Sequence, residues 1–432
     1  MNFYSTNKKT APVTFKEAVF KSIAADGGLY VPEKIPKLPP KFFEHITKLS
    51  YSEIAFEVLS PFLDEVKSQD LQKIIKNAFN FDAPLKEIDK HISVLELFHG
   101  PTLAFKDFGA RFMAQILSFF AEKNDKEINI LVATSGDTGS AVASAFYDIP
   151  GIKVMLLYPG DKVSQIQEKQ LTTFNNNITA LEVNGTFDDC QRLVKTAFLN
   201  KELNTKLTLS SANSINIARL LPQAVYYFSA YAQLKNTNPQ IIISVPSGNL
   251  GNLTGGVIAK KMGLPILHYL AALNSNTVFY DYLKTGEFNP RSSIRTISNA
   301  MDVGNPSNFH RITEFFANNV EEIRNLISAE YFSDDETKKE IKRVYEKFGY
   351  LIDPHGAVGF LALGKFIEEN NMKDYKGIVL ETAHPAKFID VMEEVVEKDI
   401  PMPERLKNCL TKEKKSIKIS NQFEDFKELL MN

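Results

Sequence analysis

The sequence contains no tryptophan and only two cysteines among its 432 residues. Cys190 and Cys409 are far apart in the chain and show neither a Cys-X-X-Cys pair nor the spacing of zinc ligands. This pattern argues against a disulfide framework and against a structural zinc site. We therefore expect a protein of a reducing compartment, the cytoplasm.

The chain also lacks long apolar runs and an excess of charge of either sign. No run of about 18 apolar residues occurs, and residues 1–10 lack the apolar segment of a signal peptide, so we expect neither a membrane span nor export. The 50 lysines and arginines nearly balance the 52 acidic residues, for a formal net charge of −2. Such a chain has no basic field to attract nucleic acid or an anionic membrane, so local groups must hold any anionic ligand.

What the sequence does contain is an alternation of β-rich runs and helical patterns from about residue 126 onward. This alternation predicts βαβ units around parallel sheets, hence an α/β fold. The length is enough for roughly two or three domains. Strands are expected at 128–133, 153–158, 178–183, 207–209, 241–245, 266–272 and 378–381.

The first 88 residues follow a different pattern, with helices expected at 15–24 and 51–66 and a turn with a short strand at 26–32. We predict an amino-terminal unit, residues 1–88, packed on a body of residues 89–432. A charged helix at 335–347 and a basic cluster at 412–418 are both expected to be solvated faces.

Lys106 lies in segment 99–113 (HGPTLAFKDFGARFM), where small and aromatic residues surround it just before an apolar helical pattern. An amine among Leu103, Phe105 and Phe108 is poorly hydrated, which disfavours its ammonium form and makes it a better nucleophile toward a carbonyl. Such a lysine can carry an aldehyde cofactor. The alternative is an ordinary surface lysine, as most lysines are.

A glycine-rich loop at 247–256 (SGNLGNLTGG) lies between the strand expected at 241–245 and a helix expected at 257–262. Its glycines let backbone amides approach an anion closely, and the helix N-terminus adds partial positive charge. We predict a phosphate site here, with a tight turn that binds nothing as the alternative. The loop lacks the ending of a Walker A motif and the dinucleotide spacing, which argues against a nucleotide.

Residues 134–140 (TSGDTGS) follow the strand expected at 128–133 and place hydroxyls and amides at the same sheet edge. This loop suits the carboxylate of an amino acid, and the alternative is a helix cap made by Ser135 or Asp137. Because the Asp137 carboxylate only accepts hydrogen bonds, we expect it to orient neighbours or to contact a cofactor rather than to hold an anionic substrate.

Two further segments carry polar groups. Residues 210–219 (SSANSINIAR) gather amide, hydroxyl and guanidinium donors, and Arg219 suits a phosphate because its planar fork binds two oxygens. The alternative is an Asn- or Ser-capped helix with Arg219 exposed. Residues 381–387 (ETAHPAK) put Thr382 at a strand end, where its hydroxyl can meet a ring nitrogen, and a plain turn is the alternative.

The histidines His99, His355 and His384 each adjoin Gly or Pro. We find no HxxxH or HExxH pairing and expect structural or hydrogen-bonding roles, not a metal site. No GxSxG elbow is present either.

Taken together, these motifs resemble the pyridoxal-phosphate enzymes of the tryptophan synthase β type, fold type II, and within them the threonine synthase family. The resemblance spans nearly the whole chain and keeps the order of its motifs. It includes Tyr4-Ser-Thr6, segment 26–32 and the segments around Lys106, Thr134, Asn213, Ser247 and Thr382.

The resemblance implies two α/β lobes with parallel or mixed twisted sheets, the smaller lobe at approximately 110–230. It implies pyridoxal 5'-phosphate as cofactor, with Lys106 as the catalytic residue that binds it covalently. The implied cofactor-binding residues are Lys106, Asp137, Ser247, Gly248, Asn249, Leu250, Gly251, Asn252 and Thr382, of which Ser247 to Asn252 cradle the phosphate and Thr382 meets the pyridine nitrogen.

The implied reaction converts O-phospho-L-homoserine and water to L-threonine and phosphate by γ-elimination and β-hydration, the last step of threonine biosynthesis. The implied substrate-binding residues are Thr134, Ser135, Thr138, Asn213, Ser214, Asn216 and Arg219. We expect no nucleic-acid or membrane partner, and a monomer or a homodimer.

Two positions depart from the wider family pattern. Asp137 stands where many fold type II enzymes place an asparagine beside the cofactor hydroxyl, and Gly356 stands where threonine or alanine is common. Two alternatives remain open: a lyase or dehydratase acting on a different hydroxyamino acid, and a non-catalytic α/β protein that binds a metabolite.

Overall fold

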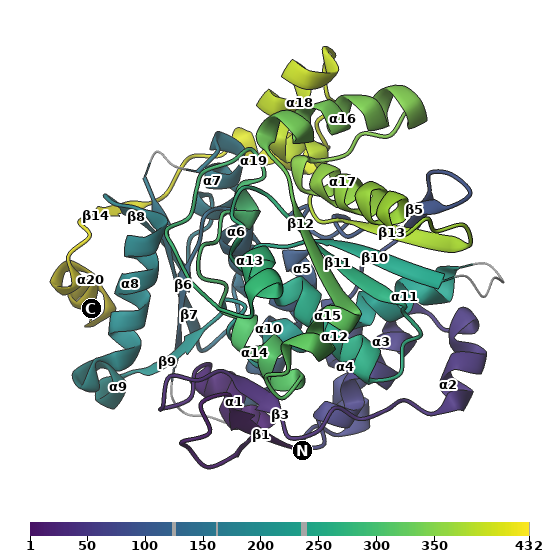
Figure 1. The fold of residues 1–432 in the computed structure, drawn as a ribbon. Helices are drawn as coiled ribbons and strands as arrows, with labels where there is room; N and C mark the ends of the chain where they lie inside the picture. The colour runs from purple at the N-terminus through teal and green to yellow at the C-terminus, as the bar shows by residue number, and fades with distance from the viewer. Residues whose placement is uncertain (123–126, 161–162, 235–239, 432) are drawn as a thin grey trace.

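The structure, a computed structural model, describes residues 1–122, 127–160, 163–234 and 240–431. Two α/β lobes lie side by side, each built around its own sheet, and a small antiparallel sheet from the N-terminus lies at the bottom of Figure 1. This arrangement confirms the predicted two-lobed α/β fold with an additional amino-terminal unit. None of the helices in the described ranges combines the length and apolar character that a bilayer crossing needs.

The larger lobe contains a six-stranded sheet in the order β12-β11-β10-β13-β5-β4, parallel except that β4 runs antiparallel to β5. Its central strand, of sequence QIIISVP, is buried along nearly its whole length, as expected for a strand with helices on both faces. The strands are β4 (Leu85–Glu87), β5 (Ile92–Glu96), β10 (Gln240–Pro246), β11 (His268–Leu273), β12 (Ile327–Tyr331) and β13 (Tyr375–Glu381).

Helices cover both faces of this sheet. α17 packs on β10, β11 and β13, with α16 and α18 outside it, whereas α12 and α11 lie on the opposite side (Figure 1). The helices of this lobe are α11 (Val225–Gln233), α12 (Gly251–Lys261), α13 (Val278–Thr285), α14 (Phe309–Phe315), α15 (Val320–Leu326), α16 (Asp334–Phe348), α17 (Pro354–Glu369), α18 (Ile389–Val396) and α19 (Glu404–Leu410).

The charged helix expected at 335–347 is confirmed as α16, and its ends show why it forms there. Ser333 and Glu336 make a capping box at its N-terminus, and Gly349 takes a left-handed φ of 64° at its C-terminus.

The smaller lobe contains a five-stranded, all-parallel sheet in the order β14-β8-β7-β6-β9. Its strands are β6 (Ile128–Ala133), β7 (Ile152–Pro159), β8 (Ile178–Val183), β9 (Thr208–Ser211) and β14 (Ile417–Ile419). Its helices are α5 (Lys106–Ala121), α6 (Asp137–Phe146), α7 (Gln165–Thr172), α8 (Phe187–Leu199), α9 (Lys201–Lys206), α10 (Ile217–Leu220) and α20 (Phe423–Met431).

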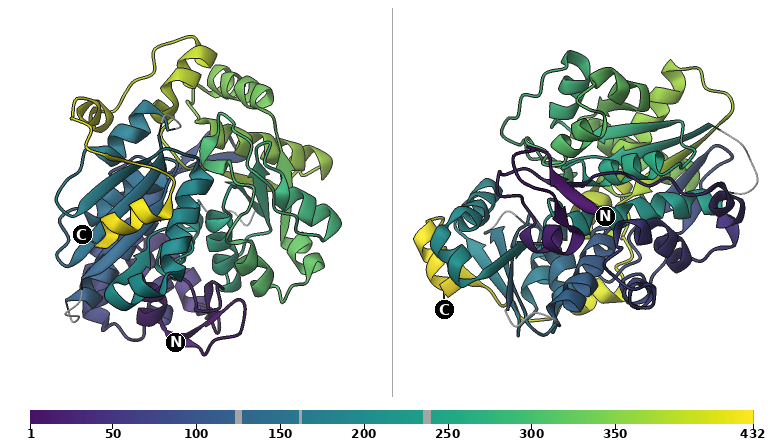
Figure 2. Two further views of the ribbon diagram at one scale, coloured as in Figure 1. Left: turned by 90° about the vertical axis from the view of Figure 1, so that its left-hand side faces the viewer. Right: turned by 90° about the horizontal axis from the view of Figure 1, so that it is seen from below.

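Most of residues 412–418 are exposed, as expected for a solvated face, but Lys414 and Ser416 are partly buried and the segment also has a structural role. Lys414 forms ion pairs of 2.7 Å with both Glu168 and Glu182, and β14 adds an edge strand beside β8. The C-terminal segment therefore leaves the larger lobe after α19 and completes the smaller one, as the yellow ribbon in Figure 2 shows.

The amino-terminal unit shares its core with the lobes. Its strands β1 (Asn2–Ser5), β2 (Val13–Thr14) and β3 (Tyr30–Pro32) form an antiparallel sheet, and Phe3 and Phe62 belong to the same apolar cluster as Phe112 and Ile243. The division at residue 88 stays a prediction. The helices of this unit are α1 (Phe15–Lys21), α2 (Pro40–His45), α3 (Tyr51–Leu59) and α4 (Ser68–Ala78).

Two helices of this unit are shorter than predicted. α1 ends at Lys21, because Ser22 takes a positive φ of 59°, and α3 passes into a 3-10 turn, η2 (Ser60–Phe62), where Pro61 follows Ser60. The other 3-10 turns are η1 (Ile46–Lys48), η3 (Leu221–Ala224), η4 (Asn299–Met301) and η5 (Pro385–Phe388).

Candidate active site

A cavity of about 1170 Å³ receives residues from both lobes and from the amino-terminal unit. Its walls include the loops that follow β6, β10 and β13, as expected for a ligand site of open α/β sheets. Of the predicted site residues, all but Asp137 and Asn216 line it. Those lining it are Lys106, Thr134, Ser135, Thr138, Asn213, Ser214, Arg219, Ser247, Gly248, Asn249, Leu250, Gly251, Asn252 and Thr382.

Lys106 is the first residue of α5, and the loop before it is fastened to the end of β13. The Phe105 amide donates to the Thr382 carbonyl at 2.8 Å, and the His384 amide donates to the Leu103 carbonyl at 3.0 Å. Leu103 takes a φ of 58°, a left-handed conformation that the surrounding contacts must maintain. These bonds fix the direction in which the half-buried Lys106 enters the cavity.

The surroundings of the Lys106 amine favour its neutral form. Burial lowers the pKa of Lys106 to about 8, the Arg219 charge acts in the same direction, and the Asp137 charge opposes both. The ammonium nitrogen lies 4.5 Å from the centre of the Phe105 ring. A neutral, nucleophilic amine is thus accessible near neutral pH.

The loop after β10 presents free backbone amides to the cavity. Leu250 takes a left-handed φ of 57° and directly precedes α12, whose first amides have no partner within the helix. Gly248 is required here, because a Cβ would lie 2.7 Å from Met301 Cα and 2.8 Å from the Ala300 carbonyl oxygen. The helix N-terminus and its free amides suit a phosphate.

Asn252 adds an unused donor to this cradle. Its Oδ1 accepts hydrogen bonds of 2.7 Å from the Tyr226 and Tyr227 hydroxyls, so the amide group is held in one orientation. Its buried Nδ2 has no hydrogen-bond partner among the described residues. A buried donor of this kind calls for an acceptor, which a bound anion can supply.

The sequence misplaced the start of this helix. α12 begins at Gly251 rather than at the expected residue 257, so Gly255 and Gly256 lie inside the helix. A Cβ on Gly256 would lie 2.9 Å from the Tyr269 ring, and one on Gly255 would lie 2.9 Å from Gln223 Cβ. These two glycines therefore serve helix packing and not the anion site.

The loop at 134–140 is organised by Thr134. Its Oγ1 accepts hydrogen bonds from the amides of Gly136 at 3.0 Å and Gly139 at 2.7 Å, so Thr134, and not Ser135 or Asp137, satisfies amides at the start of α6. Ser135 and Thr138 also line the cavity. The Thr134 hydroxyl is thus committed to the fold of the loop.

Arg219 is buried, which overturns the alternative of an exposed arginine on a capped helix. Its guanidinium donates to the Ala212 carbonyl, and its Nε has no hydrogen-bond partner among the described residues. Burial lowers the pKa of Arg219 to about 10, yet the group stays charged at neutral pH. Near it, Asn249 Nδ2 donates to Ser214 Oγ at 2.8 Å and so links the two polar loops.

The structure does not bring Asn216 to the cavity wall. Its Nδ2 donates to the Val19 carbonyl at 2.8 Å and to Ser22 Oγ at 2.9 Å, and its Oδ1 accepts from the Ala218 amide at 3.0 Å. All its polar atoms are thereby used inside the protein. Asn216 connects the amino-terminal unit to the segment that carries Arg219, so we replace the expected substrate contact with this role.

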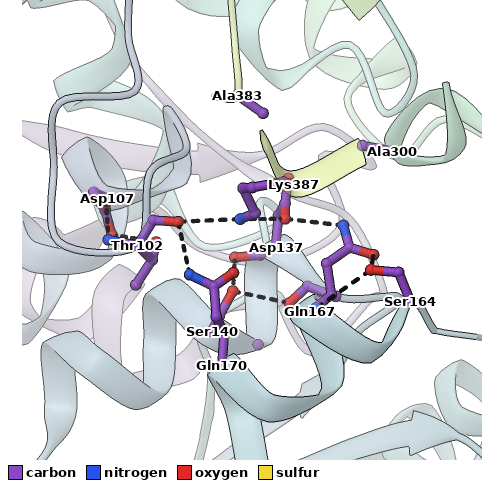
Figure 3. A network of polar contacts seen from close by, with 12 residues as sticks. Thr102, Asp107, Asp137, Ser140, Ser164, Gln167, Gln170, Ala300, Ala383 and Lys387 are labelled. Atoms are coloured by element: carbon purple, nitrogen blue, oxygen red, sulfur yellow. Dashed lines mark hydrogen bonds and ion pairs between the residues drawn. The ribbon is translucent and has the colours of Figure 1, made fainter. Parts of the chain in front are cut away.

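Asp137 also lies behind the wall, in the network shown in Figure 3. Its Oδ1 forms an ion pair of 2.6 Å with Lys387 Nζ and accepts a hydrogen bond of 3.0 Å from Gln167 Nε2. The side chain therefore orients neighbours, which is one of the two roles expected for it. Direct cofactor contact by Asp137 stays a prediction.

Sequence reasoning missed three residues near the site. His355 has Nδ1 2.7 Å from Asp353 Oδ1, and its Nε2 accepts from the Ala300 amide at 3.2 Å, which confirms the expected hydrogen-bonding role. It also lines the cavity, which was not predicted. Lys387 belongs to segment 381–387, in which the sequence predicted a role for Thr382 alone. Arg311, fully buried behind Ser214, carries no sequence signal that separates it from a surface arginine.

Within the described ranges, no cluster of three or more His, Cys, Asp and Glu side chains is placed to hold a metal ion. Apart from the Asp302 carboxylate and the imidazoles of His310 and His355, the polar side chains that line the cavity are hydroxyls, amides and cations, which suit anions.

Comparison with known proteins gives this arrangement a family. Residues 82–381 match the pyridoxal-phosphate dependent enzyme family, residues 2–79 match the threonine synthase N terminus and residues 356–430 match the threonine synthase C-terminal region. The chain is 45 % identical over 408 residues to the threonine synthase of Haemophilus influenzae, covering 94 % of each chain.

Solved structures agree with the sequence relatives. The crystal structure of threonine synthase from Escherichia coli superposes with a TM-score of 0.93 at 40 % identity, covering 100 % of both chains. A PLP-bound threonine synthase from Brucella melitensis superposes with a TM-score of 0.92 at 33 % identity, covering 100 % of this chain and 98 % of that one. The chain therefore belongs to the threonine synthase family of pyridoxal-phosphate-dependent enzymes.

Proposed function

We propose that this chain converts O-phospho-L-homoserine and water to L-threonine and phosphate, with Lys106 as the residue that binds the cofactor. The observation that carries the proposal is one cavity whose wall contains the half-buried Lys106, with a lowered pKa, and two separate sets of anion-binding groups. One set is the loop from Ser247 to Asn252, and the other surrounds Arg219. The cofactor and the substrate each carry a phosphate, which accounts for two such sets on a nearly neutral chain.

The residues present fit pyridoxal phosphate. The amides before α12 and the unpartnered Nδ2 of Asn252 can hold its phosphate, and the Lys106 amine can bond its aldehyde. The hydroxyl of Thr382 is suited to the pyridine nitrogen, and as a neutral group it would leave that nitrogen unprotonated. Pyridoxal phosphate, when bound, supplies an electron sink for the carbon atoms of an amino acid.

The side chains have distinct tasks in this proposal. The Lys106 amine, neutral in part near neutral pH, takes protons from the α and β carbons of the substrate and returns protons at the γ and α carbons. Arg219 Nε and the neighbouring Ser214 hydroxyl hold the substrate phosphate until it leaves from the γ carbon, and Ser135 and Thr138 hold the carboxylate. Water then adds at the β carbon.

The amino-terminal unit closes part of the cavity. Thr6, Asn7 and residues of the turn at Gly27 and Gly28 line it together with the lobes. Such a wall limits the access of water to reactive intermediates. This suits the proposed reaction, in which water takes part at only one step. We further infer a cytoplasmic enzyme, which the low cysteine content of the sequence supports, and a monomer or homodimer.

The proposal is tested with purified full-length protein and synthetic O-phosphohomoserine. We expect phosphate release matched by L-threonine, identified by mass and chirality. Reduction of the cofactor-loaded protein with borohydride, followed by peptide mapping, should place the adduct on Lys106. An adduct on another side chain, or a protein that takes up no pyridoxal phosphate, would overturn the assignment.

Arg219 separates this reaction from a dehydratase or lyase that uses an unphosphorylated substrate. Because charge-assisted hydrogen bonds are worth about 1.5–3 kcal/mol each, Arg219→Ala should lower kcat/KM for O-phosphohomoserine by at least about tenfold. Cofactor uptake should not change. The matched control is Arg324→Ala, whose guanidinium contacts Leu283, Lys284 and Glu321 outside the cavity. Unchanged kinetics in Arg219→Ala would reject the phosphate assignment.

A further inference from the structure

We propose that Lys387 is a positioning residue of this site, which holds the loop carrying Lys106 and neutralises the buried Asp137 carboxylate behind the cavity wall. The inference rests on the proposed function, since it concerns the amine that binds the cofactor. Lys387 lies in η5, just beyond the strand that ends at Thr382. It does not line the cavity, so it acts through the residues it contacts.

The contacts of Lys387 join the two lobes. Its side chain has 0 % exposure, and its Nζ lies 2.6 Å from Asp137 Oδ1 of α6 and donates to the Thr102 carbonyl at 3.1 Å (Figure 3). A buried ammonium is costly unless it is paired and hydrogen-bonded, and these two acceptors meet that need. The same two contacts fix the places of Asp137 and Thr102.

Thr102 passes this constraint to Lys106. Its amide and hydroxyl donate to Asp107, at 2.8 and 2.7 Å, and Asp107 directly follows Lys106 at the start of α5. Gln170 Nε2 of α7 donates to the same Thr102 carbonyl at 3.1 Å. The loop before Lys106 is therefore held from the larger lobe by Lys387 and from the smaller lobe by Gln170.

A second branch of the network holds Asp137 itself. Gln167 Nε2 donates to Asp137 Oδ1 at 3.0 Å, and Gln167 Oε1 accepts from Ser164 Oγ at 3.2 Å and from Asn299 Nδ2 at 3.4 Å. Lys387 and Gln167 thus hold the carboxylate between them, and from this place its charge acts on Lys106.

The charges near Lys106 show what the ion pair does. Arg219 disfavours the Lys106 ammonium and Asp137 favours it. The Asp107 charge acts in turn on Arg219, and the charges of Lys387 and His355 act on Asp137. Asp137 and Lys387 together carry no net charge. The ion pair therefore has the same net charge as the neutral asparagine that many fold type II enzymes have at position 137. Asp137 without Lys387 would instead carry a charge of −1.

The test measures the pKa of Lys106 in the cofactor-free full-length protein. The rate at which an acylating reagent modifies Lys106 is followed by peptide mass spectrometry at a series of pH values. In Lys387→Gln, Asp137 loses its cation, so the Lys106 pKa should rise by roughly one unit. The double variant Asp137→Asn/Lys387→Gln should return it to within a few tenths of the wild-type value. A change that merely disturbs packing predicts no such return.

Three controls keep the outcome clear. Lys387→Arg keeps the charge and should leave the Lys106 titration unchanged, as should Lys365→Gln, which breaks a surface ion pair with Glu330. If Lys387→Gln does not fold, Asp137→Asn alone provides the test, because loss of the carboxylate should lower the Lys106 pKa. An unchanged Lys106 pKa in Lys387→Gln, or no recovery in the double variant, would overturn the proposal. Borohydride mapping of the wild type tests the cofactor assignment separately, so the failure of either proposal can be recognised.

Discussion

Gly356 stands where the family resemblance leads us to expect threonine or alanine, and its surroundings explain the glycine. A Cβ at this position would overlap Glu381 Oε2 and lie 2.6 Å from Ile352 Cγ1. Glu381 is fully buried, and its Oε1 accepts from the Asp353 amide at 2.6 Å, so the carboxyl cannot move aside freely. Burial and the Asp353 charge raise the pKa of Glu381 well above its ordinary value. The glycine therefore makes room for a buried carboxylic acid beside Thr382.

We predict that Gly356→Ala destabilises the protein by about 1–3 kcal/mol, the usual cost of overpacking a dense interior. The measurement is the free energy of unfolding from urea titration. Gly364→Ala is the matched control on the same helix, because nothing lies within 4 Å of its added Cβ. It should stabilise the protein by about 0.5–1 kcal/mol through backbone entropy. Equal effects of the two substitutions would contradict the crowding at Gly356.

Single residues differ in how well the sequence exposes their roles. Lys106 was recognisable because its apolar neighbours are adjacent in the chain. Asn216 was not placed correctly, because its partners Val19 and Ser22 lie far away in the sequence. The ion pair of Asp137 with the equally distant Lys387 was not foreseen either. A polar side chain predicted from its own motif can be turned inward by a distant partner.

At the level of secondary structure, strands with continuous apolar sequence were predicted well. β6 and β8 have the expected bounds, and β7, β10 and β13 differ from expectation by a few residues. β14 was not recognised, because this three-residue strand lies in a lysine-rich segment and is held by contacts with β8 and the acidic Glu182. Its position is set by tertiary contacts that local sequence does not carry.

His268 gives β11 a pH-dependent contribution to stability. It is the first residue of the strand, its Nε2 lies 3.0 Å from Ser328 Oγ, and its ring stacks on Phe366 with centroids 5.0 Å apart. Burial lowers the pKa of His268 to about 4 in the folded protein. Below about pH 6.5 the unfolded chain binds a proton at this histidine, whereas the folded protein does not until the pH approaches 4. The unfolding free energy that His268 contributes above about pH 6.5 is therefore lost as the pH falls toward 4.

We therefore predict that His268→Gln reduces the loss of unfolding free energy between pH 7 and pH 5 by about 1–2 kcal/mol, a value discounted for the partial exposure of the ring. Urea titrations of both proteins at the two pH values measure the difference. His45→Gln, at an exposed histidine of α2, is the control and should keep the wild-type pH dependence. The same loss in His268→Gln and wild type would show that His268 does not titrate in this way.

For the molecule as a whole, the amino-terminal unit is part of the active-site architecture. Arg311, fully buried, donates to the Tyr30 carbonyl at 3.0 Å and to the Ser214 carbonyl at 2.9 Å, and so ties β3 to the segment that carries Arg219. Ser22 makes a second tie, since its Oγ accepts from the Ser211 amide at 2.8 Å and from Asn216 Nδ2 at 2.9 Å. Substrate binding should therefore depend on residues outside the two lobes.

Ser22→Ala tests this dependence. Loss of the hydroxyl leaves the buried Ser211 amide without its partner, at a cost of about 1–3 kcal/mol, and loosens the segment that holds Arg219. We expect KM for O-phosphohomoserine to rise about fivefold or more while the affinity for pyridoxal phosphate, which contacts the loop after β10 in our proposal, stays the same. Thr205→Ala, which removes an exposed hydroxyl bonded within α9, should change neither quantity. If Ser22→Ala weakened cofactor binding as much as substrate binding, the amino-terminal unit would support the whole cavity and not the substrate segment in particular.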